Sequence, residues 1–125
     1  MIALVVMAST GLTAVPAAAN HTVCDSGEFC IWENPNYGGD FWGADRSDPD
    51  WPCGWICHPN LDNNEDSLKN LTGVTIDVFD ADNYGGGVNY CVPAGVWEND
   101  IAGDRDNDGN SSKPRSSFCP LSLRP

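Results

Sequence analysis

Hydrophobic and aromatic residues fall into short runs separated by turn-forming residues along most of the chain. The runs are rich in β-branched and aromatic side chains and cover residues 28–33, 40–43, 73–79, 87–92 and 117–119. Gly, Pro, Asn and Asp separate them, and no stretch beyond residue 20 shows a helical period. The pattern predicts short antiparallel strands that form a small β-sandwich or barrel.

The first 19 residues differ from the rest of the chain. They carry no charge, an apolar stretch covers residues 2–15, and Pro16 precedes three alanines that suit a signal peptidase. The stretch is short for a membrane span, which needs about 20 residues. We interpret residues 1–19 as a secretion signal that is removed before folding, with an ordinary first helix as the alternative. Residues 20–125 are then expected to form one extracellular domain.

All six cysteines lie after the predicted signal. This even number indicates an oxidising compartment and three disulfides, whose pairing the sequence leaves open. A domain of about 100 residues buries only a modest core, so the bridges are expected to stabilise it. The cysteines are Cys24, Cys30, Cys53, Cys57, Cys91 and Cys119. The acidic stretch at residues 44–66 contains three prolines and is predicted to be loop.

The acidic composition excludes several function classes. With 18 acidic and 6 basic side chains, the net charge is −12, which repels phosphate backbones and anionic lipid headgroups. The sequence therefore predicts neither a nucleic-acid nor a membrane partner. His21 and His58 are the only histidines, and no nucleophile or paired metal-ligand motif is present. The run from Cys53 to His58 is similar to a haem-attachment site with one residue too many, and a disulfide is the simpler explanation. We predict a protein that is not an enzyme and has no organic cofactor.

Two sequence elements occur twice in the same order. The tetrapeptide Asn-Tyr-Gly-Gly at residues 36–39 returns at residues 83–86, and an aromatic residue precedes each tyrosine by five positions. In a folded hairpin, the second aromatic packs over the first, and the glycine takes a positive φ. Residues 63–69 align in the same way with residues 107–113, and both segments are rich in Asn, Asp and Ser. The repeat predicts two similar halves within one domain.

These repeats resemble the βγ-crystallin Greek-key domains. Each of two motifs in that family supplies an aromatic-x4-aromatic-x-Gly hairpin and a later Asn/Asp-Asn/Asp-x-x-Ser/Thr-Ser loop. Residues 107–112 fit the loop pattern, and residues 63–68 fit it except at Leu68, where the family has serine. The resemblance covers about residues 29–112. It implies an all-β, disulfide-stabilised double Greek-key sandwich, with one Greek key at about residues 24–72 and the other at about residues 73–119.

The resemblance also implies calcium, with up to two ions. In the family, an ion lies between the loop of one motif and the hairpin of the other. A hard cation prefers oxygen ligands, which these loops supply whatever the family. Carried over to this chain, the two ligand sets are Glu33 with Asp108, Asn110 and Ser111, and Asp80 with Asn64, Asp66 and Ser67.

Two other interpretations compete for the second loop. Residues 104–109 match the first half of an EF-hand loop, but Arg115 stands where the bidentate glutamate belongs, and Pro114 blocks the exiting helix. An EF-hand is therefore rejected. The remaining alternative is a turn that binds nothing, because Asn, Asp and Ser favour turns through local hydrogen bonds.

The run from Phe29 to Gly39, on a short disulfide-linked chain, is similar to small bacterial inhibitors of metallopeptidases. The resemblance implies that a rigid loop occludes the cleft of a secreted peptidase. The predicted inhibitory loop spans residues 89–95, with Cys91 as its anchor, Val92 as the inserted apolar side chain, and Pro93 next to it. The competing interpretation makes Val92 part of an ordinary core strand.

Three functions therefore compete for this chain. We expect a monomeric secreted peptidase inhibitor first, and a calcium-binding structural module second. An antimicrobial or toxin-like protein comes third, because an acidic chain adheres poorly to anionic membranes. Calcium binding and inhibition are compatible with each other.

Overall fold

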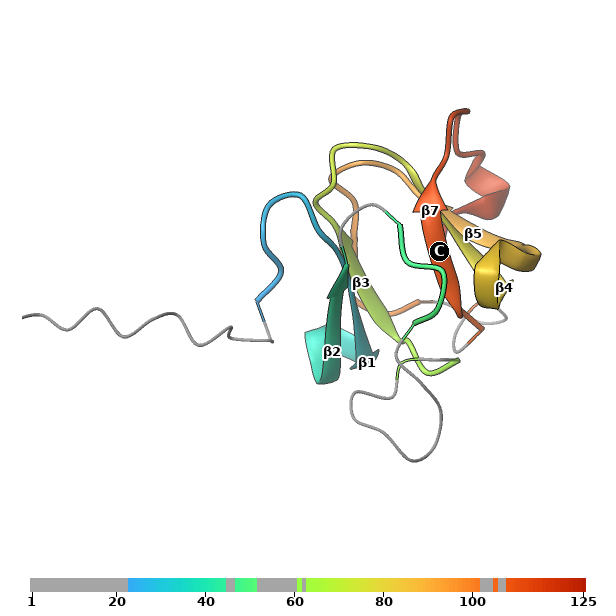
Figure 1. The fold of residues 1–125 in the computed structure, drawn as a ribbon. Helices are drawn as coiled ribbons and strands as arrows, with labels where there is room; N and C mark the ends of the chain where they lie inside the picture. The colour runs from blue at the N-terminus through green and yellow to red at the C-terminus, as the bar shows by residue number, and fades with distance from the viewer. Residues whose placement is uncertain (1–22, 45–46, 52–60, 62, 102–104, 106–107) are drawn as a thin grey trace, which may run out of the picture.

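The computed structural model describes residues 23–44, 47–51, 61, 63–101, 105 and 108–125. The strands of this part form two antiparallel sheets (Figure 1). The first sheet has the strand order β2-β1-β3-β6, and the second has the order β5-β4-β7. The predicted all-β fold is confirmed. The strands are β1 (Phe29–Asn34), β2 (Gly38–Ala44), β3 (Ser67–Asn70), β4 (Ile76–Ala81), β5 (Gly85–Val92), β6 (Trp97–Glu98) and β7 (Ser111–Pro114).

Most of the predicted runs form strands, and the described strands β3, β6 and β7 lie outside these runs. Four of the five predicted runs overlap β1, β2, β4 and β5, but the run at residues 117–119 is not a strand. The last strand is instead β7, whose sequence Ser-Ser-Lys-Pro has no apolar pattern. β7 exists because its backbone pairs with β4, from Ile76 opposite Pro114 to Phe79 opposite Ser111. Tertiary pairing here overrides local propensity.

The two halves of the chain exchange strand segments. β6 comes from the second half but pairs with β3 of the first sheet. In the opposite direction, Asp48 of the first half forms an isolated antiparallel bridge with Ser112 of β7. Each half therefore completes hydrogen bonding in the sheet of the other half, which couples the two halves.

The hydrophobic core draws its side chains from both sheets. Alternate residues of β1 and β4 point inward, and Trp51 from the long connection after β2 packs against Phe29 with ring centroids 6.4 Å apart. Burial of each large apolar side chain contributes about 1.5–3 kcal/mol to folding. The core consists of Phe29, Ile31, Trp51, Leu61, Leu68, Ile76, Val78, Tyr90, Val92 and Ile101. Leu68, which departs from the crystallin loop pattern, is thus a core residue.

The doubled hairpins fold as the repeat predicts. Short 3-10 turns, η1 (Pro35–Tyr37) and η2 (Asp82–Tyr84), join β1 to β2 and β4 to β5. The second aromatic ring packs edge-on against the first in both, with centroids 5.2 Å apart for Trp32 and Tyr37 and 5.7 Å apart for Phe79 and Tyr84. The glycine that follows has φ of +73° in the first hairpin and +75° in the second.

The predicted secretion signal lies outside the described residues. Among the residues that the structure describes, no helix has the length and apolar character needed to cross a membrane.

Candidate functional site

A serine holds the loop and the hairpin together in each half. Ser67 Oγ accepts the backbone N–H of Tyr37 at 3.0 Å and donates to the carbonyl of Asn34 at 2.7 Å. Ser111 Oγ accepts the N–H of Tyr84 at 3.1 Å and donates to the carbonyl of Ala81 at 2.6 Å. The identical contacts explain why the same loop sequence occurs twice.

The predicted calcium ligands are grouped within each half by hydrogen bonds. In the first half, Asn64 Nδ2 donates to Glu33 Oε1 at 3.0 Å. In the second half, Asn110 Nδ2 donates to the carbonyl of Asp80 at 2.7 Å. The resemblance implies that each loop shares its ligands with the hairpin of the other half. In the structure, each of these two hydrogen bonds instead joins a loop to the hairpin of its own half. The two loops also touch, because the N–H of Asn63 donates to the carbonyl of Gly109 at 2.9 Å.

Two buried oxygens in these loops fit a hard cation. Asp66 Oδ1 and Asn110 Oδ1 are inaccessible to solvent and have no hydrogen-bond partner among the described residues. They occupy equivalent positions, each directly before the serine that holds its loop. An unpaired buried polar atom is costly, and a bound cation would remove that cost. Carboxylate and amide oxygens are ligands that calcium prefers. Asp108 and Asp80, also predicted as ligands, are exposed.

The structure buries two of the three residues predicted for the inhibitory loop. Val92 is fully buried, lies opposite Ile76 in the second sheet, and belongs to the core. Its carbonyl accepts a hydrogen bond of 2.8 Å from Asn70 Nδ2. Cys91 is also fully buried, and only Pro93 of the three predicted residues is partly accessible. A side chain that completes the core cannot enter a peptidase cleft without unfolding the strand, so the burial of Val92 favours the competing interpretation as a core strand.

Two disulfides join cysteines within the described residues. Cys24 bonds to Cys30, and Cys91 bonds to Cys119. Cys53 and Cys57 lie outside the described residues. The second bridge ties the end of β5 to the segment that follows β7.

This last segment was missed by sequence reasoning. Phe118 is 75% exposed and Leu121 is 77% exposed, on either side of the Cys119–Pro120 pair. We predicted a strand at residues 117–119, which places Phe118 in a sheet. The signal in the sequence is the pair of apolar residues Phe118 and Leu121, which flank Cys119-Pro120 and have serines on their outer sides.

Two aromatic rings, the half-buried Tyr37 and the exposed Trp97, pack against Lys69. Its ammonium lies 4.2 Å from the ring centroids of both Tyr37 and Trp97. Burial, followed by the nearby Glu98 carboxylate, raises the pKa of the Tyr37 hydroxyl above its ordinary value. Tyr37 therefore stays neutral at physiological pH. Lys113 packs on Phe79 and Tyr84 in the same manner in the second half, so this stacking belongs to the repeat.

A family model described as peptidase inhibitor family I36 matches residues 17–91. The chain belongs to peptidase inhibitor family I36. The prediction of a peptidase inhibitor that is not an enzyme is thereby confirmed. No curated protein sequence matches the chain significantly.

Solved structures similar to this I36 chain are βγ-crystallin domains. A structure described under "Evolution of the eye lens beta-gamma-crystallin domain fold" has a TM-score of 0.61 and 15% identity, and the match covers 77% of this chain and 93% of that chain. A crystallin from Ciona intestinalis has a TM-score of 0.55 and 21% identity, with coverage of 71% and 100%. A domain from Clostridium beijerinckii has a TM-score of 0.53 and 21% identity, with coverage of 72% and 99%. At these identities the likeness shows the fold, and the predicted crystallin-like architecture is confirmed.

Proposed function

We propose that this I36 member is a secreted inhibitor of metallopeptidases that blocks the active-site cleft of its target. The observation that carries the proposal is the family match over residues 17–91, since it identifies the class of target as a peptidase. The two disulfides support an extracellular location, where such bridges persist. Because the net charge of −12 repels nucleic acid, a protein is the more favourable partner.

The architecture suits an inhibitor that works by occlusion. Two coupled sheets around a shared core form a rigid support, and disulfides restrict the segments that leave it. Rigid binding segments lose little conformational freedom on association, so more of the contact free energy appears as affinity. A substrate of similar sequence but flexible structure would bind less tightly.

Titration of a thermolysin-type metallopeptidase with the purified, oxidised protein tests this function. We expect inhibition at nanomolar to micromolar concentration and an equivalence point near one inhibitor per enzyme. The reduced and alkylated protein is the matched control, and it should inhibit much more weakly because its segments are no longer constrained. Full peptidase activity at a large molar excess of oxidised protein would contradict the proposal. Inhibition of serine peptidases alone would contradict its metallopeptidase part.

Calcium binding is the second candidate function, and it is compatible with inhibition. It is supported by the buried oxygens of Asp66 and Asn110, at equivalent positions of the two loops. The neighbouring Asn64 and Glu33 in the first half supply further oxygen ligands. A bound ion would stabilise the loops that connect the hairpins to β3 and β7.

Thermal unfolding with and without calcium tests this second function. A ligand that binds only the folded protein stabilises it by mass action. We expect millimolar calcium to raise Tm by about 5 °C or more. The double variant Asp66→Ala/Asn110→Ala should lose this shift, while Asp25→Asn, a change of an exposed acid outside both loops, should keep it. A Tm that is the same in calcium and in chelator would count decisively against the site.

A further inference from the structure

The segment that follows β7 exposes two large apolar side chains. Phe118 and Leu121 are 75% and 77% exposed, more than any other large hydrophobic residue that the structure describes. The chain forms a narrow loop beyond the end of β7 before it returns through η4 (Leu121–Leu123), as the red part of Figure 1 shows. We call residues 115–121 the C-terminal segment.

The C-terminal segment is held at its beginning by Arg115. Its Nε donates to the carbonyl of Phe118 at 3.1 Å, and its Nη1 forms an ion pair of 2.9 Å with Asp77 of β4. The backbone N–H of Arg115 also donates to the carbonyl of Thr75 at 2.8 Å. Because Asp77 is nearly buried, this ion pair is better shielded from solvent than a surface pair. Arg115 therefore fixes the backbone conformation at Phe118.

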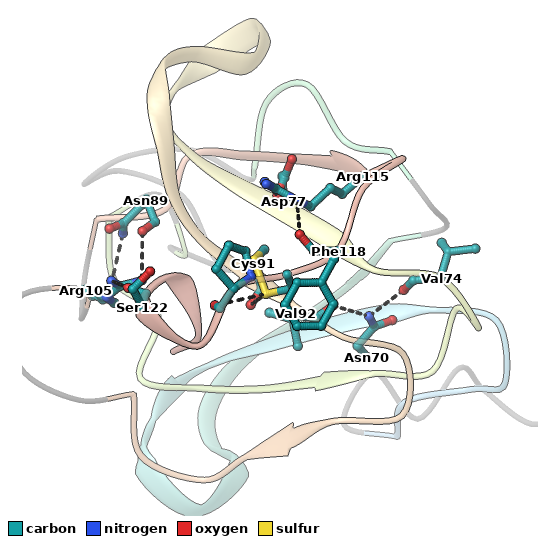
Figure 2. The surroundings of a disulfide bond; sticks show 12 residues. Asn70, Val74, Asp77, Asn89, Cys91, Val92, Arg105, Arg115, Phe118 and Ser122 are labelled. Carbon is teal, nitrogen blue, oxygen red and sulfur yellow. Dashed lines mark hydrogen bonds and ion pairs between the residues drawn. A yellow bond between two sulfur atoms is a disulfide. The ribbon is translucent and has the colours of Figure 1, made fainter.

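The other end is held by the disulfide and by Arg105. Cys119 is bonded to Cys91 at the end of β5, directly after Phe118 (Figure 2). Beyond it, the guanidinium of Arg105 donates to the carbonyls of Asn89 and Ser122. The exposed ring of Phe118 thus sits between two anchored points, so its presentation costs little entropy on binding.

The charge of this region differs from that of the rest of the chain. Residues 113–125 contain Lys113, Arg115 and Arg124 and no acidic residue, so their charge is +3 in a chain whose net charge is −12. Half of the six basic side chains thus lie in the last 13 residues. Although Arg115 is paired with Asp77, this region is less acidic than the rest of the protein, so it would meet an acidic enzyme surface with less repulsion.

We propose that the C-terminal segment is the part of the inhibitor that enters the peptidase cleft. Phe118 occupies the apolar subsite that receives the substrate side chain directly after the scissile bond, and Leu121 contacts the rim of the cleft. This assignment rests on the proposed function, and Phe118 takes the role that the sequence analysis gave to the buried Val92. Exposed aromatic residues at the centre of an interface commonly contribute most of its affinity. Trp97, the other strongly exposed aromatic residue, has its ring stacked on Lys69 and is not assigned to the cleft.

Inhibition constants of four proteins against a thermolysin-type metallopeptidase test the proposal. We expect Phe118→Ala to raise Ki about 30-fold or more, and Phe118→Leu to stay within about 3-fold, because an apolar side chain is kept. Trp97→Ala is the matched control, an exposed aromatic residue on the other sheet, and should change Ki less than about 3-fold. Because both rings are exposed, Tm should stay close to that of the unaltered protein in all variants.

The outcomes separate this proposal from the one on which it rests. Failure of the unaltered protein to inhibit removes the proposed function and, with it, this assignment. Strong inhibition by the unaltered protein with the same Ki for Phe118→Ala overturns the assignment alone. If Phe118→Ala lowers Tm, Phe118→Leu decides: a Ki close to the unaltered value with a restored Tm supports the assignment, and a Ki as high as that of the alanine variant overturns it.

Discussion

Replacing Val92 with aspartate is expected to unfold the protein and not only to remove its inhibitory activity. Val92 is fully buried in the core, between the strand partner Ile76 and the amide of Asn70. A carboxylate at this position would lie among the apolar side chains of the core, and burial of such a group costs several kcal/mol. The total stability of a small domain is only about 5–15 kcal/mol.

Denaturant unfolding measures this effect directly. We expect Val92→Asp to lose about 4 kcal/mol or more of the free energy of unfolding, or to show no cooperative transition. The matched control is Val23→Asp, since Val23 is 52% exposed and the change should stay within about 0.5 kcal/mol. A Val92→Asp protein that unfolds at the normal denaturant concentration yet no longer inhibits would show that Val92 takes part in inhibition directly.

Removal of the Cys91–Cys119 disulfide is expected to affect both stability and inhibition. The bridge joins residues 28 positions apart, so in the chain-entropy model its loss costs about 3–4 kcal/mol. It also releases the C-terminal segment from β5. The double variant Cys91→Ala/Cys119→Ala should therefore inhibit far more weakly than its remaining folded fraction would explain.

The first disulfide provides the matched control. Cys24 and Cys30 are only 6 positions apart, so the double variant Cys24→Ala/Cys30→Ala should lose only about 2 kcal/mol. This bridge ties the chain before β1 to Cys30 of β1 in the first sheet, whereas the C-terminal segment follows β7 of the second sheet, so Ki should be nearly unchanged. Unfolding curves and inhibition titrations of both variants, at a temperature where both remain folded, give the comparison. Equal loss of inhibition in the two variants would show that the second bridge acts through general stability.

The repeated hairpin shows how much of this fold can be predicted from local pattern. A glycine with positive φ and two stacked aromatic residues depend on a few neighbouring positions, so the spacing of Trp32, Tyr37 and Gly39 is sufficient to predict them. The repeat of the two loops can also be predicted from the sequence. In the structure, Ser67 and Ser111 make the same contacts in their two halves. Such features need no knowledge of the rest of the chain.

The candidate sites were harder to predict, for a physical reason. Val88, Tyr90 and Val92 form an alternating pattern that suits a core strand and an exposed binding edge equally well, and only the packing of the opposite sheet distinguishes the two. The loop ligands likewise depend on which hairpin lies beside each loop. This is set by the pairing of β3 with β1 and of β7 with β4, between residues far apart in the sequence.

The sequence alone therefore determined the β class, the twofold repeat, the hairpin geometry and the inhibitor family, because each depends on short-range spacing. The tertiary structure decided which apolar residues are buried and which are exposed. Val92 and Phe118 are both apolar and lie beside disulfide-bonded cysteines, yet one is fully buried and the other is 75% exposed. The difference arises because Val92 lies in β5 and packs in the core, whereas Phe118 lies beyond the last strand, where the Cys91–Cys119 disulfide holds the backbone but the ring points to solvent.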